Sequence, residues 1–176
     1  IVDTTDFFVT GGSYSNIKVG RGLTVYSKAT RQAFPFFVDG EVRSSIIVNE
    51  DVLNVPTPML YVVGKFSYIT YGDTTVSKES GLRIYSNNIA KINLSTLLKV
   101  PQSSISPTFG TQTYQTFVNC RCINAIEYMN GKLYVGGDFE VLFESTLAAK
   151  NLVALNTLGN IDTTWYPIVL GEVMTL

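Results

Sequence analysis

Side chains that commonly carry catalytic chemistry are scarce in this sequence. None of the 176 residues is a histidine, so the chain lacks the usual partner of a Ser or Cys nucleophile. Two carboxylates about 5 to 9 Å apart can hydrolyse a glycosidic bond, and Glu50 and Asp51 are the clearest acidic pair. The tetrad SNIK at residues 15–18 matches an S-x-x-K motif, but it follows a Gly turn instead of opening a helix. We therefore predict that the protein is not an enzyme.

Two cysteines and one aspartate are the candidates for metal or redox chemistry. Cys120 and Cys122 are two residues apart, near the outer limit of disulfide reach on a strand, so we expect free thiols. A C-x-C pair supplies only two of the four ligands that structural zinc needs. Asp138 is not followed by a second acidic residue at calcium-ligand spacing. The sequence predicts neither a metal nor a cofactor.

Charge and hydropathy exclude two classes of partner. The chain has 13 basic and 14 acidic residues and a net charge of −1, so it lacks the basic excess of a nucleic-acid-binding protein. The longest apolar stretches, residues 34–38 and 165–170, are far shorter than the roughly 20 residues of a membrane-spanning helix. The chain begins at Ile1 without a signal-peptide pattern. We expect a processed product or a piece of a longer polypeptide.

The elements that must position these side chains are predicted to be strands. Short runs of Val, Ile, Tyr, Phe and Thr alternate with Gly, Asn, Asp and Pro at intervals of around ten residues. Residues 145–156 also contain good helix formers, but the matching segment 89–92 contains strand formers and favours a strand. Strands are expected near residues 46–48, 60–64, 89–93, 123–128, 132–136 and 151–155, with 133–135 buried on both faces.

An internal repeat organises the chain. Segments 123–126, 133–139, 151–156 and 161–165 are answered in the same order by segments 42–45, 60–66, 88–93 and 105–109. A fainter copy opens the chain at residues 8–14 and 22–27. This divides one domain, residues 1–176, into repeats 1–39, 40–116 and 117–170. Residues 171–176 begin another repeat, because GEV at 171–173 repeats GEV at 40–42.

The last copy carries a family resemblance. The segments NGKLYVGGDF at 130–139, NLVALN at 151–156 and GNIDTTWYP at 159–167 resemble the delta-sixty β-propeller repeat. That family occurs in secreted and surface proteins of bacteria and in tail proteins of bacteriophages, and it shares a blade-forming scaffold without catalytic residues. The resemblance implies an all-β fold of antiparallel β-propeller-like blades. Since propellers close with about four to eight blades, three repeats imply part of a larger propeller or assembly.

The repeat motif suggests structural roles for its residues. Glycines after the strand permit close backbone approach or a bulge. We expect Asp138 to bind backbone amides at a turn, and Asn93 and Asn156 to form turns. Trp165 and its counterpart Phe109 are expected to be core aromatics between blades, with sugar stacking by Trp165 as the alternative. The motif residues are Gly11, Gly12, Gly64, Gly136, Gly137, Asp138, Phe139, Asn93, Asn156 and Trp165.

Two functions agree with this composition. The first is a non-catalytic structural or assembly domain of a large extracellular or virion complex, with a bacteriophage tail component favoured. Its partners would be other subunits or further repeats of the same polypeptide. The second is an adhesin that binds a cell-surface glycan or receptor through Tyr68, Tyr71 and Tyr85, the last two of which bound a polar insert. Both place the protein in a virion or at a cell surface.

Overall fold

The computed structural model describes residues 2–4, 6–16, 20–71, 84–86, 88–99, 103–106, 109, 115–165 and 167–176. These residues form antiparallel β-sheets, as the sequence predicts, and each expected strand is present. The elements are β1 (Val2–Asp3), β2 (Phe7–Asn16), β3 (Gly20–Ser27), β4 (Gln32–Val38), β5 (Glu41–Val52), β6 (Val55–Lys65), β7 (Tyr68–Tyr71), β8 (Ile84–Tyr85), β9 (Ile89–Asn93), β10 (Gln115–Met129), β11 (Lys132–Phe143) and β12 (Thr146–Leu155), with the short helix α2 (Leu94–Leu97).

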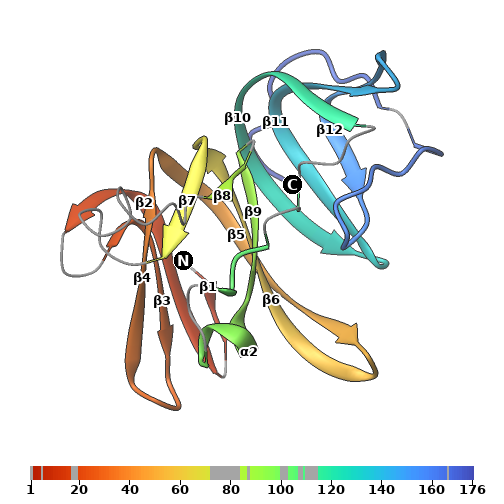
Figure 1. Ribbon diagram of the computed structural model, residues 1–176. Coiled ribbons are helices and arrows are strands. Elements are labelled where there is room, and N and C mark those ends of the chain that lie inside the picture. The colour runs from red at the N-terminus through yellow and green to blue at the C-terminus, as the bar shows by residue number, and fades with distance from the viewer. Residues whose placement is uncertain are drawn as a thin grey trace.

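The strands form three sheets that follow one another along the chain (Figure 1). The first has the order β1-β2-β3-β4-β7-β8, the second β5-β6-β9 and the third β10-β11-β12. Segment 145–156 is therefore strand and not helix, because β12 pairs with β11 along most of its length. The sheets do not close into a ring within the described residues.

Two apolar cores lie between the three sheets. Along β6, Leu60 and Val62 belong to the core shared with the first sheet, whereas Tyr61 and Val63 belong to the core shared with the third. This alternation follows from the two-residue period of a strand, which sends successive side chains to opposite faces. The second sheet is thus buried on both faces and lies between the other two.

The two faces of the third sheet are buried to different degrees. Leu133 and Val135 pack in the core against the second sheet. Tyr134, on the opposite face, is only half-buried, and so is Leu152. The expectation that residues 133–135 are buried on both faces is therefore wrong for Tyr134, because within the described residues only the C-terminal segment, through Val173, covers part of this face.

The second and third sheets have a register shift at the same position of the repeat. β5 and β6 shift register between Val42 and Ser44. β10 and β11 shift in the same way between Ile123 and Ala125. In both cases one extra residue, Arg43 or Asn124, bulges out of the ladder.

The segments after β9 and β12 also correspond. Single antiparallel bridges join Ile92 to Ile105 and Leu155 to Ile161. The backbone N–H of Asn93 donates to Ser104 O over 2.8 Å, and the backbone N–H of Asn156 donates to Asn160 O over 2.8 Å. Each of these two sheets therefore has a fourth segment, reduced to one bridge at its outer edge.

The repeat boundaries at 39/40 and 116/117 do not coincide fully with the sheets. β7 and β8 come from the second repeat, yet β7 pairs with β4 and extends the first sheet.

No helix in the described part of the chain has the length and apolar character to cross a membrane.

Leu133 offers a test of the core between the second and third sheets. Leu133→Ala is expected to lower the free energy of unfolding by about 2–5 kcal/mol, because it removes apolar volume from a fully buried site. Urea denaturation measures this loss. Leu170→Ala is the matched control, since Leu170 is 90% exposed and its truncation should change stability by less than about 0.5 kcal/mol. Equal losses in both variants would contradict the placement of β11.

Candidate functional site

Of the candidate catalytic groups, the structure describes Glu50 most fully. Glu50 accepts hydrogen bonds from the Tyr61 hydroxyl and, at 2.8 Å, from Lys91 Nζ, so it serves a structural ion pair. Desolvation, followed by the hydrogen bond to Glu50, raises the pKa of the Tyr61 hydroxyl. Part of the S-x-x-K tetrad, residues 17–18, lies outside the described residues. Among the described residues, no group of three Cys, Asp or Glu side chains is arranged to hold a metal ion.

Both cysteines are free thiols, as expected. Burial is the main cause that raises the pKa of Cys120 to about 11, although the Asn88 side chain opposes this effect. Burial also raises the pKa of Cys122, and a hydrogen bond from its Sγ to Glu172 adds to the rise. These thiols are therefore protonated at neutral pH and unsuited to nucleophilic chemistry.

The motif glycines occupy two kinds of crowded position. A Cβ at Gly64 would lie 2.0 Å from Glu41 O, and one at Gly137 would lie 2.4 Å from Cys122 O. Only glycine lets the middle strand approach the neighbouring strand this closely, as the sequence predicts. Gly12 lies within β2.

Gly11 and Gly136 make room for the next repeat instead. A Cβ at Gly11 would lie 2.6 Å from Cγ1 of Val42 in β5, and one at Gly136 would lie 2.5 Å from Cγ1 of Val173. Val42 and Val173 occupy the same position in the two GEV segments of the sequence. The C-terminal segment thus packs on the third sheet as β5 packs on the first.

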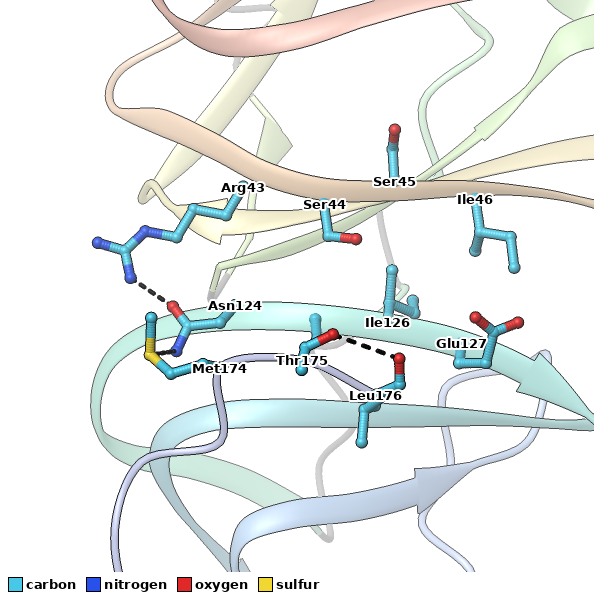
Figure 2. A pocket seen from close by; sticks show the side chains of 11 residues that line it. Arg43, Ser44, Ser45, Ile46, Asn124, Ile126, Glu127, Met174, Thr175 and Leu176 are labelled. Atoms are coloured by element: carbon cyan, nitrogen blue, oxygen red, sulfur yellow. Dashed lines mark hydrogen bonds between the residues drawn. The ribbon is translucent and has the colours of Figure 1, made fainter. Parts of the chain in front are cut away.

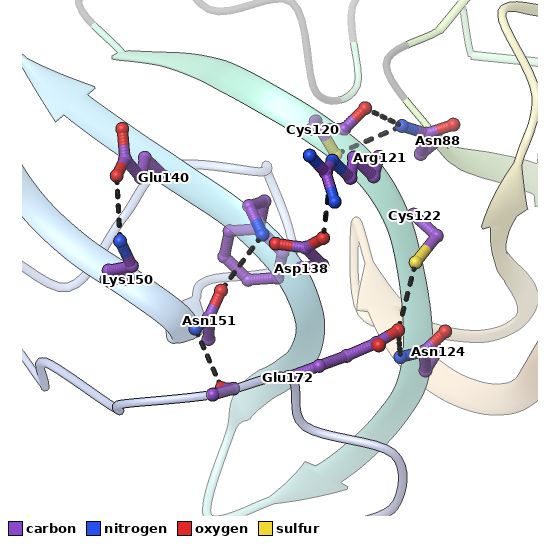
Figure 3. A network of polar contacts seen from close by, with 12 residues as sticks. Asn88, Cys120, Arg121, Cys122, Asn124, Asp138, Glu140, Lys150, Asn151 and Glu172 are labelled. Carbon is purple, nitrogen blue, oxygen red and sulfur yellow. Dashed lines mark hydrogen bonds and ion pairs between the residues drawn. The ribbon is translucent and has the colours of Figure 1, made fainter.

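Two buried asparagines with positive φ connect each sheet to the segment that follows it (Figure 3). Asn88 Oδ1 accepts a 2.7 Å hydrogen bond from Phe66 N, and Asn151 Oδ1 accepts a 3.1 Å bond from Phe139 N. Asn88 Nδ2 then donates to Cys120 O over 3.3 Å. Asn151 Nδ2 donates to Val169 O and Gly171 O over 3.0 and 2.7 Å. The repeat alignment pairs these asparagines, but their amide contacts were not predicted.

Asn93 and Asn156 lie at turns, as expected. Asn93 Oδ1 accepts from Thr96 N over 2.9 Å and caps α2. Asn156 Oδ1 accepts from Leu158 N and Asn160 N over 3.0 and 2.9 Å. Phe139 is buried and packs edge-on against Phe117, with ring centroids 5.2 Å apart.

Asp138 is not a turn residue. It lies within β11, opposite Cys122, because the ladder continues past the two glycines to Phe143. Its carboxylate lies 3.7 Å from Nε of Arg121, whose side chain is largely exposed. The expected role in binding turn amides is therefore wrong.

A polar pocket of about 400 Å³ lies where the first strands of successive repeats meet (Figure 2). β5, β10 and the C-terminal segment each contribute a run of neighbouring residues to it. Asn124 is at the centre, since its Oδ1 accepts from Arg43 and its Nδ2 donates to Glu172 Oε1 and Val173 O over 2.7 and 2.9 Å. The bond from Asn124 is the main cause that lowers the pKa of Glu172.

This pocket was not predicted from the sequence. The repeat alignment places Arg43, Asn124 and Met174 at equivalent positions, but it does not show that they converge. The lining residues are Arg43, Ser44, Ser45, Ile46, Asn124, Ala125, Ile126, Glu127, Met174, Thr175 and Leu176. Such a lining can hold a small polar group by hydrogen bonds but contains no paired acid and base.

The outer face of the third sheet presents an aromatic pair. Trp165 packs edge-on against Tyr134, with centroids 5.5 Å apart, just as Phe109 packs against Tyr61 at 5.2 Å. Phe109 is only 3% exposed because the third sheet covers it, whereas Trp165 is 36% exposed. The expectation that Trp165 is a core aromatic is therefore wrong for this structure, although its partner ring is the expected counterpart.

A short polar turn positions Trp165. Asp162 Oδ1 accepts from Thr164 N over 3.0 Å, and Asp162 O accepts from Trp165 N over 3.1 Å. Lys132 Nζ donates to Asp162 Oδ2 over 2.5 Å, and this bond is the main cause that lowers the pKa of Asp162 to about 2. Ionised Asp162 is thus the acceptor that organises this turn next to Trp165.

The three tyrosines of the predicted binding loop lie on the added strands of the first sheet. Tyr68 and Tyr85 are cross-strand partners whose ring centroids are 6.1 Å apart. Tyr71 packs against Phe36 at 5.5 Å and is half-buried, whereas Tyr85 is 66% exposed. Residues 72–83 of the insert lie outside the described residues.

Comparison with known proteins adds no relative. No family model, curated protein or solved structure matches this chain.

Asn151 offers a test of the amide connection. Asn151→Gly keeps the left-handed backbone but leaves the buried Phe139 N–H without its acceptor, so we expect a loss of about 1–3 kcal/mol. Asn151→Ala should lower the free energy of unfolding by about 1–2 kcal/mol more, because alanine, unlike glycine, is strained at positive φ. Chemical denaturation of both variants separates the two effects. Unchanged stability in Asn151→Gly would contradict the structural role of the amide.

The thiol of Cys120 gives a pH-dependent test. In the Cys122→Ala variant, alkylation of the native protein by iodoacetamide should be slow at pH 8 and should rise with pH toward about 11. The same protein in denaturant should react with the pH profile of an ordinary thiol, with a midpoint at a pH of about 8.5. A native midpoint as low as the denatured one would show that Cys120 is not desolvated.

Proposed function

We propose that this chain is a non-catalytic structural domain of a large extracellular or virion complex, such as a bacteriophage tail. In this proposal its sheets act as propeller-like blades of a longer array. The second and third sheets have the same register shift and corresponding glycine and asparagine contacts, and this supports a repeated building unit.

The observation that carries the proposal is the difference between two equivalent aromatic pairs. Tyr61 and Phe109 are covered by the third sheet, whereas Tyr134 and Trp165 form part of an uncovered face. Half-buried Tyr134 and Leu152 beside exposed Trp165 form a surface of a kind that partners commonly cover. Another sheet of the same kind, from a further repeat or a neighbouring subunit, fits this face.

An adhesin is the second candidate. Tyr85 is 66% exposed and packs edge-on against Tyr68, so the two rings present an aromatic surface on which a sugar ring can stack. This surface lies on the first sheet, away from the Tyr134–Trp165 face. Variants at the two surfaces therefore distinguish the two functions.

Trp165 is the single tryptophan of the chain and reports directly on its face. Covering this face should shift the Trp165 emission to shorter wavelength and protect it from iodide quenching as protein concentration rises. Tyr134→Asp should abolish both effects and weaken association at least about tenfold, as expected for loss of a buried aromatic contact.

Tyr85→Ser is the control for this experiment and should leave the fluorescence changes intact. Conversely, glycan binding on an array that is lost in Tyr85→Ser but retained in Tyr134→Asp would favour the adhesin. An iodide-accessible Trp165 in the fully associated protein would overturn the scaffold proposal.

A further inference from the structure

The β5–β6 hairpin is longer than its counterpart in the third sheet. The β10–β11 hairpin ends at the pair Met129 and Lys132, which corresponds to Val48 and Met59. Beyond that point, β5 and β6 continue for four more pairs, from Asn49 and Pro58 to Val52 and Val55. Figure 1 shows this hairpin, in orange, projecting from the molecule.

The hairpin ends in an exposed apolar tip. Leu53 is 91% exposed, Val55 is 59% exposed and Val52 is 39% exposed. A cluster of this kind is unfavourable in water and commonly marks a contact surface. We refer to these three residues as the apolar tip.

The turn at the tip is strained. Leu53 and Asn54 have φ values of 53° and 62°, which is typical of a type I′ turn. The equivalent turn in the third sheet uses Asn130 and Gly131, the residues that such a turn prefers. A leucine at positive φ costs stability, and because Leu53 is 91% exposed, packing within the molecule offsets little of this cost.

The extension is rigidly held and protected against strand addition. Glu50, inside the extension, accepts from Tyr61 and Lys91 of the sheet below it. Pro56 and Pro58 lie on the part of β6 that β9 does not reach, so this edge lacks two N–H donors. A partner is therefore contacted through the side chains of the apolar tip and not by extending the sheet.

A matching apolar pocket lies at the other end of the strands. It has a volume of about 300 Å³ and lies beside the β11–β12 turn. Its rim includes Leu147, 47% exposed, and Ile168, 54% exposed. Because a cavity of about 150 Å³ already holds a benzene ring, this pocket has room for one leucine side chain. Its lining residues are Phe143, Thr146, Leu147, Ala148 and Ile168.

We propose that the apolar tip of one copy of this chain inserts Leu53 into the apolar pocket of a second copy. The tip and the pocket lie at opposite ends of the strands, so the contact is head-to-tail and repeats along one direction. A lipid surface is the less suitable occupant, because residues 49–58 include Glu50 and Asp51 but no Lys or Arg. This inference rests on the assembly role proposed above and adds a contact separate from the Tyr134–Trp165 face.

Sedimentation of the full chain at concentrations up to about 1 mM tests the contact. Wild-type mass should rise with concentration, and Leu53→Asp and Ile168→Asp should each weaken association at least about tenfold. Mixing these two variants should restore dimers but not longer chains, because each variant keeps one intact half of the contact. Met129→Asp, at the exposed tip of the shorter hairpin, is the matched control and should associate like wild type.

The double variant Leu53→Asn/Asn54→Gly keeps the experiment independent of misfolding. It installs the turn residues of the third sheet, so its thermal unfolding midpoint should rise while head-to-tail association is lost. Protection of Trp165 from iodide should persist in this variant, because the apolar tip is not part of the Tyr134–Trp165 face. The head-to-tail contact can therefore fail while the proposed function stands. A monomeric wild type, a mixture without dimers, or equal weakening by Met129→Asp would overturn the head-to-tail contact.

Discussion

The structure depends on one constraint: a sheet that is apolar on both faces must be covered on both. The second sheet illustrates the constraint, since Leu60 and Val62 face one core while Tyr61 and Val63 face the other. A sheet of this composition is stable only between two neighbours, because a single partner leaves one apolar face in water. The position of the second sheet between the other two follows from this requirement, and the partly uncovered face of the third sheet is where a further neighbour would fit.

The connections between sheets meet the constraint with backbone contacts. Gly64 and Gly137 allow two strands to approach closely, and Asn88 and Asn151 then fasten each sheet to the segment that follows it. A buried amide with both its oxygen and its nitrogen hydrogen-bonded specifies geometry more strictly than apolar contact does. The same geometry therefore recurs in successive repeats, and the polar pocket around Asn124 forms where their first strands meet.

These features are the basis of the assembly role that we propose. Glu50 pairs with Lys91, and the two thiols are desolvated. The two surfaces that we propose for assembly lie where corresponding residues of the repeats have different surroundings. Trp165 has the place of buried Phe109, and Leu53 has the place of Asn130. Deviations from an internal repeat thus locate the surfaces that we propose for assembly.

The sequence by itself determined the all-β class, the repeat alignment and the positions of the strands in the second and third sheets, because alternation, glycine and asparagine act through local backbone geometry. Only the tertiary structure decided that Asp138 continues a strand, that Trp165 is exposed and that β7 and β8 join the first sheet. It also brought Arg43, Asn124 and Glu172 together. These outcomes depend on which strands pair and which faces are covered. Such choices are made between residues far apart in the chain, where no local pattern records the partner.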